Sequence, residues 1–216
     1  MKKILILIAL FNGYGLFPCF GYEDTVKYIF FLHNRFPETH DLSEPHPEYG
    51  LTEYQAILDT FESHGFRVIS EIRKGNVNAR EYALTVCRQI DRLLRAGVKP
   101  SDITVIGTSK GGYIAQYVST FMQLPELHFV FVACFRETDI QDIPDINFCG
   151  NILTIYEKTD PFGVSAIKRK ENSTCRIAHF REIALHTGLG HGFLFRPLDA
   201  WTRPAMAWAK GCYTPE

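Results

Sequence analysis

Short runs of apolar residues recur along the chain, and each run ends in polar or turn-forming residues. Runs without an alternation of polar and apolar positions are typical of parallel strands, which are buried on both faces. The runs of this kind lie at residues 26–34, 66–72, 102–107, 127–134, 151–157 and 176–186. The pattern therefore predicts a core of buried strands.

Between these runs, apolar residues recur every three or four positions, which predicts amphipathic helices. One predicted helix begins with a capping box made by Thr52 and Gln55 and ends at Gly65. The next ends at Gly97, shortly before Pro100, and two more follow residue 109 and residue 198. Their apolar stripes are Tyr54, Ile57, Leu58 and Phe61; Tyr82, Val86, Ile90, Leu93 and Leu94; Tyr113, Ile114, Tyr117, Val118 and Phe121; and Trp201, Met206 and Trp208.

The alternation of strands and helices defines the expected fold class. Such strands run parallel and are joined by right-handed crossovers, which place helices on both faces of the sheet. We therefore expect an α/β fold with a doubly wound, mainly parallel sheet of about six strands. No repeat, low-complexity segment or linker divides the sequence, so residues 22–216 are expected to form a single domain without a bulky lid.

The first residues resemble a secretory signal peptide. Lys2 and Lys3 precede an apolar run from Ile4 to Phe11, and small or turn-forming residues follow. Such a peptide would direct export of the protein to the periplasm or the medium. Cleavage after Gly21 would then remove residues 1–21. The alternative is that the run forms a first buried strand and the protein is cytoplasmic; the run is too short to span a bilayer as a helix.

Composition narrows the possible functions. The 216 residues carry a formal net charge of -1, with basic residues scattered along the chain, so charge offers no reason to expect nucleic acid or an anionic membrane as a partner. The six cysteines show no CxxC spacing, so a zinc site is not expected. An oxidising compartment would permit one or two disulfides, whereas Cys87 and Cys134 fit small buried core residues better.

A serine motif stands between a predicted strand and a predicted helix. Gly107, Ser109 and Gly111 satisfy G-x-S-x-G, which holds a nucleophilic serine on a tight turn at the carboxyl end of a sheet. A phosphate-binding P-loop is excluded because Tyr113 follows Gly112 where Lys and then Ser or Thr would be needed, and the dinucleotide fingerprint fails because position 109 is not glycine.

A serine nucleophile needs a base and an acid that orients the base. Asp160 follows the strand at residues 151–157, and His191 lies in a glycine-rich loop after the next strand, so the order Ser, Asp, His is met. Asp160 could instead cap a helix that follows it. The less favoured acids are Asp142 and Asp145, and the rival base is His186.

Acyl transfer also needs donors for the oxyanion. The backbone of Lys110 is one candidate, and Asn34 or Arg35, directly after the first strand, is the other. We expect the Lys110 side chain to face solvent or an acidic substrate group. The loop that follows contains His40 and His46 in no standard metal-ligand spacing, so it is expected to line the cleft.

These motifs together resemble the α/β-hydrolase superfamily, over nearly all of the chain after the leader. The resemblance rests on "YIFFLHN", "GTSKGG", "TDPFG" and "GHGF". It implies Ser109 as nucleophile, His191 as base and Asp160 as acid, on an architecture similar to dienelactone-hydrolase-like and cutinase-like esterases with the first two strands missing or reduced. Many members carry His-Gly where this chain has His33 and Asn34, which leaves the second oxyanion donor open.

The resulting hypothesis is a serine hydrolase, a carboxylesterase or thioesterase, that cleaves a small-molecule ester or related acyl bond through an acyl-enzyme. It requires no metal and no organic cofactor. Two alternatives stay open: a catalytically silent scaffold that binds a ligand or partner, and an acyltransferase that uses the same triad. Fold analogy does not choose a substrate.

Overall fold

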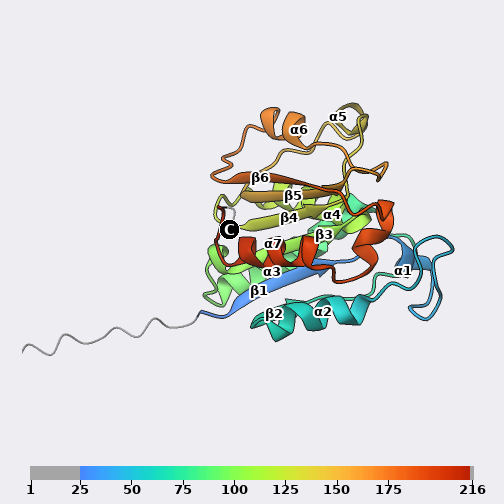
Figure 1. Cartoon of the computed structure of the whole chain (residues 1–216). Helices are drawn as coiled ribbons and strands as arrows, with labels where there is room; N and C mark the ends of the chain where they lie inside the picture. Colours follow the sequence, from blue (N-terminus) through green and yellow to red (C-terminus); the bar gives the residue numbers. More distant parts are fainter. Residues whose placement is uncertain (1–24, 215–216) are drawn as a thin grey trace, which may run out of the picture.

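The computed structural model of the chain describes residues 25–214. The expected signal peptide, residues 1–21, lies outside the described residues and stays a prediction. Within the described range, six strands form one parallel sheet in the order β2-β1-β3-β4-β5-β6 (Figure 1). They are β1 (Lys27–Leu32), β2 (Phe66–Ile69), β3 (Ile103–Thr108), β4 (His128–Val132), β5 (Asn151–Glu157) and β6 (Phe180–Leu185).

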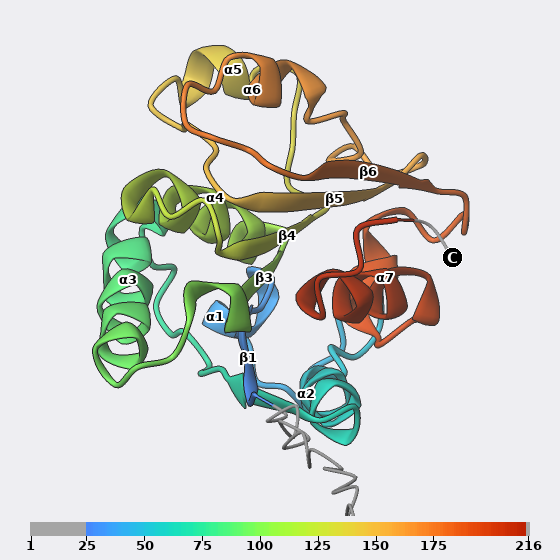
Figure 2. The same ribbon diagram turned by 90° about the vertical axis from the view of Figure 1, so that its left-hand side faces the viewer.

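Helices cover both faces of this sheet, which confirms the predicted α/β class. Figure 2 shows α3 (Ala79–Arg95) and α4 (Lys110–Met122) on one face, and α2 (Tyr54–Ser63) and α7 (Asp199–Ala209) on the other. The shorter elements of the described residues are α1 (Phe36–Thr39), α5 (Asp139–Asp142), α6 (Ile167–Glu171) and the 3-10 turns η1 (Pro100–Asp102) and η2 (Gly190–Phe195). None of the helices in residues 25–214 has both the length and the apolar character needed to cross a membrane.

The strand order creates a site at one edge of the sheet. The chain runs from β1 outward to β2, returns to β3 on the other side of β1, and then proceeds outward to β6. The connection that follows β1 therefore lies on one face of the sheet, and the connection that follows β3 lies on the other. Ligands of open parallel sheets bind at such a topological switch point, outside the carboxyl ends of the two strands. Asn34 follows β1 and Ser109 follows β3, so the two lie beside this point.

Two apolar clusters, one on each face, form the core. Every residue of β3, β4 and β5 is buried, which explains why these strands read as continuous apolar runs. The edge strands β2 and β6 are only partly buried. On one face the rings of Phe61 and Trp201 meet edge to face at 6.0 Å and join α2 to α7.

The start of α2 differs from the sequence prediction. The expected capping box is wrong, because no side chain caps the helix at Glu53, the Thr52 hydroxyl has no hydrogen-bond partner, and Gln55 bonds to Asp59 instead. The backbone N–H of Glu53 donates to the carbonyl of Phe195 at 2.8 Å. A contact from η2, distant in the chain, therefore holds the position that local capping was expected to hold.

One disulfide lies in the described residues. It joins Cys149, just before β5, to Cys175, before β6, with Cα atoms 5.1 Å apart. On a chain-entropy model, a bridge across a separation of 26 residues stabilises the fold by about 3.5 kcal/mol. Cys87 and Cys134 are buried free thiols, as expected, and Cys212 is an exposed one.

Candidate active site

Ser109 lies on the sharp turn between β3 and α4, where its φ of 50° and ψ of -117° are rarely adopted by residues with a side chain. The flanking glycines make this turn possible. A Cβ on Gly107 would overlap the backbone of Gly111, and a Cβ on Gly111 would overlap the carbonyl of Leu32 in β1. The N–H of Ser109 donates to the carbonyl of Val132 at 2.8 Å, which anchors the turn to β4.

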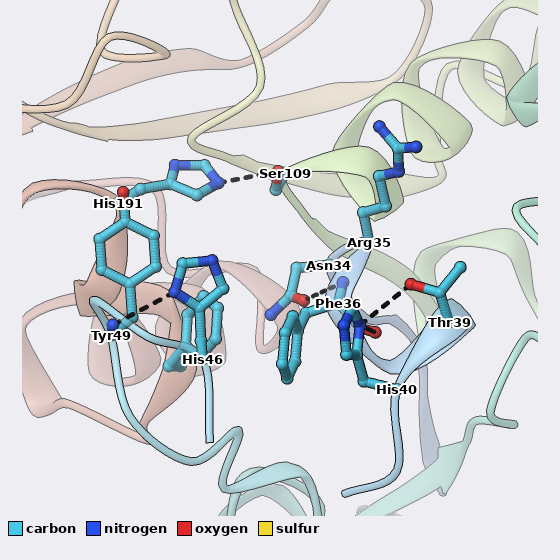
Figure 3. Close-up of a pocket in the computed structure, with 10 residues that line it drawn as sticks. Asn34, Arg35, Phe36, Thr39, His40, His46, Tyr49, Ser109 and His191 are labelled. Atoms are coloured by element: carbon cyan, nitrogen blue, oxygen red, sulfur yellow. Dashed lines mark hydrogen bonds between the residues drawn. The ribbon is translucent and has the colours of Figure 1, made fainter. Parts of the chain in front are cut away.

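The structure brings Ser109, His191 and Asp160 together in one hydrogen-bonded chain. The Ser109 hydroxyl lies 2.8 Å from Nε2 of His191, and Nδ1 of His191 lies 2.7 Å from Oδ2 of Asp160 (Figure 3 shows the first pair). An ionised aspartate only accepts, so the imidazole proton resides on Nδ1 and Nε2 is free to accept the proton of Ser109. The Asp160 side chain is fully buried and that of His191 is 12% exposed.

Asp160 also organises its own turn. Its second carboxylate oxygen, Oδ1, accepts from the N–H of Phe162 at 2.9 Å. The alternative that Asp160 caps a helix is wrong, because the next helix, α6, begins only at Ile167; one carboxylate oxygen instead stabilises the turn and the other bonds to His191. The rival residues are elsewhere: His186 is exposed, as are Asp142 and Asp145.

The candidate oxyanion residues come from two parts of the fold: Lys110 begins α4, and Asn34 and Arg35 follow β1. Lys110 is the first residue of α4, so its backbone N–H has no partner inside the helix. Asn34 and Arg35 line the same cavity as Ser109 and His191. Oδ1 of the buried Asn34 accepts from the N–H of Phe36 at 2.9 Å, which leaves its amide NH₂ as a donor available at the cavity (Figure 3).

The sequence reasoning missed a buried ion network behind this loop. Glu38 accepts from Nε of Arg73 at 3.0 Å and from Nζ of Lys110 at 2.5 Å, and both carboxylate oxygens are thereby used. The side chains of Glu38 and Arg73 are 0% and 1% exposed. The expectation that the Lys110 side chain faces solvent is therefore wrong: the side chain is 16% exposed, and its ammonium group pairs with the buried carboxylate of Glu38. A buried carboxylate needs such partners to offset its loss of hydration.

His33 extends the network to the backbone beside Asn34. Burial and the charge of Arg73 lower the pKa of His33 to about 3, so its ring is neutral. Nε2 accepts from the N–H of Arg73 at 2.9 Å, hence Nδ1 carries the proton and donates to the carbonyl of Asn34 at 2.6 Å. The guanidinium of Arg73 donates to the carbonyls of His33 and Asn34 as well. The loop after β1 is thus held by a set of buried polar contacts.

Beside Ser109 lies a cavity of about 300 Å³ with aromatic walls. The ring of His40 stacks on Phe36 at 4.1 Å, and that of His46 stacks on Tyr49 at 4.4 Å. Phe195 of η2 closes the wall between them. The loop that contains His40 and His46 therefore lines the cleft, and in residues 25–214 no three His, Cys, Asp or Glu side chains are grouped so that they could hold a metal ion.

Comparisons with known proteins bear on the fold. No protein-family model matches the chain, and no curated protein matches its sequence. A protein of unknown function from Agrobacterium tumefaciens, described as a candidate α/β hydrolase, is 18% identical, with a TM-score of 0.57 over 88% of this chain and 89% of that one. A candidate esterase from Staphylococcus aureus is 14% identical, with a TM-score of 0.57 over 88% and 76% of the two chains.

A third solved structure is a single-residue variant of SOBER1 from Arabidopsis thaliana, 15% identical, with a TM-score of 0.51 over 83% of this chain and 100% of that one. At such identities the likeness concerns the fold, and that fold is the one inferred from the sequence motifs.

Proposed function

We propose that this chain, which has the fold of the α/β-hydrolase superfamily, is a serine hydrolase that cleaves an ester or related acyl bond. The observation that carries the proposal is the hydrogen-bonded chain from Ser109 through His191 to Asp160 at the wall of a cavity. The solved structures it resembles include a candidate hydrolase and a candidate esterase, which agrees with a hydrolase.

In the first half of the reaction, Nε2 of His191 takes the proton of Ser109 as the serine oxygen attacks the carbonyl carbon. The negative charge that develops on the carbonyl oxygen is stabilised by the N–H of Lys110 and by a donor from Asn34 or Arg35. When the intermediate collapses, the bond to the leaving group breaks, and His191 returns the proton to the departing oxygen or sulfur. Ser109 is left as an acyl ester.

Water completes the cycle. His191, still oriented by Asp160, accepts a proton from a water molecule while the water oxygen attacks the acyl carbon. Collapse releases the carboxylic acid, and the proton on His191 returns to Ser109. The chemistry balances without a metal or an organic cofactor.

The cavity favours a small substrate with an apolar group. Its lining is dominated by aromatic and imidazole rings and contains no acidic side chain. A volume of about 300 Å³ lies at the lower end of small-molecule pockets. We therefore propose esters with a short or aromatic apolar part as substrates, in preference to long-chain lipids.

We also propose that the protein is exported. The support is the charged start and apolar middle of residues 1–21 together with the disulfide between Cys149 and Cys175. The mass of the amino-terminal peptide from the natural source tests this directly, because cleavage after Gly21 would leave Tyr22 as the first residue.

Active-site labelling tests the hydrolase proposal. A fluorophosphonate probe should form a stoichiometric adduct on Ser109, mapped by peptide mass spectrometry, and should not label Ser109→Ala. Ser165 is a suitable control, since it lies outside the cavity and its Ala variant should be labelled normally. A folded wild-type protein that stays unlabelled while a known serine esterase reacts under the same conditions would contradict the proposal.

A further inference from the structure

A buried carboxylate outside the triad lies between the two loops that carry Asp160 and His191. Glu157 is the last residue of β5 and is 0% exposed. Its Oε2 accepts from the N–H and the hydroxyl of Thr187, both at 2.7 Å. Its Oε1 accepts from the hydroxyl of Thr159 at 3.2 Å and from the N–H at 3.3 Å. One side chain thus receives bonds from the residue before Asp160 and from the loop that leads to His191.

The hydroxyls of Thr159 and Thr187 also bond to the loop that contains His191. Because an ionised carboxylate only accepts, each hydroxyl turns its proton toward Glu157 and keeps lone pairs for another donor. The hydroxyl of Thr159 accepts from the N–H of Gly190 at 3.1 Å, and that of Thr187 accepts from the N–H of Leu189 at 3.2 Å. Gly190 is directly bonded to His191, so the network reaches the backbone of the proposed base.

Glu157 has the protonation state that this pattern needs. Burial by itself would raise the pKa of the carboxyl, but the bonds from Thr187 and Thr159 outweigh burial and lower the pKa below its ordinary value. At neutral pH the side chain is therefore a carboxylate, and all four donors point toward it.

The loop with His191 needs external support of this kind. Gly188 and Gly190 both have positive φ, at 72° and 52°, in conformations that glycine adopts readily and also leaves readily. Triad geometry must hold within a fraction of an ångström for proton transfer to remain efficient. A contact that ties this loop to the loop of Asp160 supplies that constraint.

We propose that Glu157 is a positioning residue that, through Thr159 and Thr187, holds the loop of Asp160 against the loop of His191. The inference rests on the proposed serine hydrolase function and deepens it. Glu157 touches neither the reacting atoms nor the cavity, and it acts on the rate by maintaining the hydrogen bond from His191 to Asp160.

The variant Glu157→Gln tests this role at nearly constant volume, because it replaces one acceptor oxygen with an NH₂ group that faces N–H and O–H donors. With a soluble aryl ester as substrate, kcat should fall by about 30- to 100-fold while KM changes by less than about three-fold. The downfield proton NMR signal of His191 Nδ1–H, which reports its bond to Asp160, should weaken or disappear.

Glu182→Gln is the matched control. Glu182 lies on the neighbouring strand β6 and accepts from the hydroxyl of Thr154 at 3.2 Å and from the N–H of Ala166, six residues after Asp160, at 2.8 Å; these bonds involve neither Thr159 nor Thr187. This variant should retain the kcat and the NMR signal of the wild type. An equal loss of kcat in both variants would overturn the proposal in favour of a general effect on β5 and β6.

A pair at Thr159 covers the case in which Glu157→Gln does not fold. Thr159→Ser keeps the hydroxyl and should retain kcat, whereas Thr159→Val removes it and should lower kcat without changing KM. Wild-type kcat in folded Glu157→Gln or in Thr159→Val would overturn the positioning role. Failure of the function itself would appear separately, as absence of labelling at Ser109 in the wild type.

Discussion

The two carboxylate oxygens of Asp160 have different hydrogen-bond partners, so a substitution can change one bond and keep the other. Oδ1 shapes the turn by accepting from Phe162, and Oδ2 accepts from His191. An asparagine at this position can still accept from Phe162 through its oxygen, but it then presents an NH₂ group to Nδ1 of His191. The imidazole would have to carry its proton on Nε2, where it cannot accept the proton of Ser109.

We therefore expect Asp160→Asn to lower kcat by about 10³- to 10⁴-fold with little change in stability. The measurement is steady-state hydrolysis of an aryl ester, with thermal unfolding as the check on folding. Asp145→Asn, at an exposed carboxylate considered as a less favoured acid, is the control and should leave kcat unchanged. A loss of less than ten-fold in Asp160→Asn would argue against the assigned role.

The turn between β3 and α4 shows how closely neighbouring elements approach at the proposed nucleophile. Gly111 sits in the first turn of α4 directly against the carbonyl of Leu32 in β1, and Gly112 sits against Cys134 after β4. A side chain at either position would push the helix away from the sheet. The small residues around Ser109 are thus demanded by packing between elements as well as by the conformation of the turn.

Gly111→Ala should consequently destabilise the fold by about 3 kcal/mol or more, because the added methyl group overlaps backbone atoms that cannot move aside. Gly65→Ala is the control: Gly65 has a φ of 88°, and a Cβ added there would meet no atom within 4 Å. Gly65→Ala should lower the free energy of unfolding by about 1–2 kcal/mol, because alanine is strained in the left-handed backbone conformation. Urea unfolding of both variants provides the comparison, and equal losses would contradict the packing explanation.

At the scale of the whole molecule, two histidines are buried in the neutral form. Burial and the charge of Arg73 lower the pKa of His33 to about 3, and burial and the charge of Lys27 lower the pKa of His128 to about 4. As the pH falls below about 6.5, which is the pKa of histidine in the unfolded chain, His33 and His128 each bind a proton in the unfolded state but not in the native state. The stability contributed by these groups is complete above pH 6.5 and is lost as the pH falls toward 4.

We expect the free energy of unfolding to fall by up to about 2 kcal/mol per histidine between pH 7.5 and pH 5, above the range in which carboxylates titrate. Urea unfolding at the two pH values measures the difference. His33→Gln and His128→Gln should each remove about half of it, whereas His186→Gln, at an exposed site, should not. A wild-type stability that is flat across this range would contradict the expectation.

The sequence by itself determined the architecture and the order of the proposed triad. Strands buried on both faces must be apolar throughout, and helices on a sheet must carry an apolar stripe, so both leave a periodic pattern. The carboxyl ends of parallel strands meet at one edge, so Ser109, Asp160 and His191 could be placed together from their positions after strands. The strained turn at Ser109 also left a local signal, because only glycine fits beside it.

Only the tertiary structure decided which distant polar residues pair. Glu38 and Arg73 are separated by 35 positions, and nothing in the local sequence of either distinguishes it from a solvated charge. The same holds for Glu157 and Thr187, which meet because β5 and β6 end side by side. The two wrong expectations, a capping box at Thr52 and a solvent-facing Lys110, have the same cause. In the folded chain, Phe195 binds the N–H at the start of α2 and Glu38 binds the Lys110 ammonium group, and both partners are distant in the sequence.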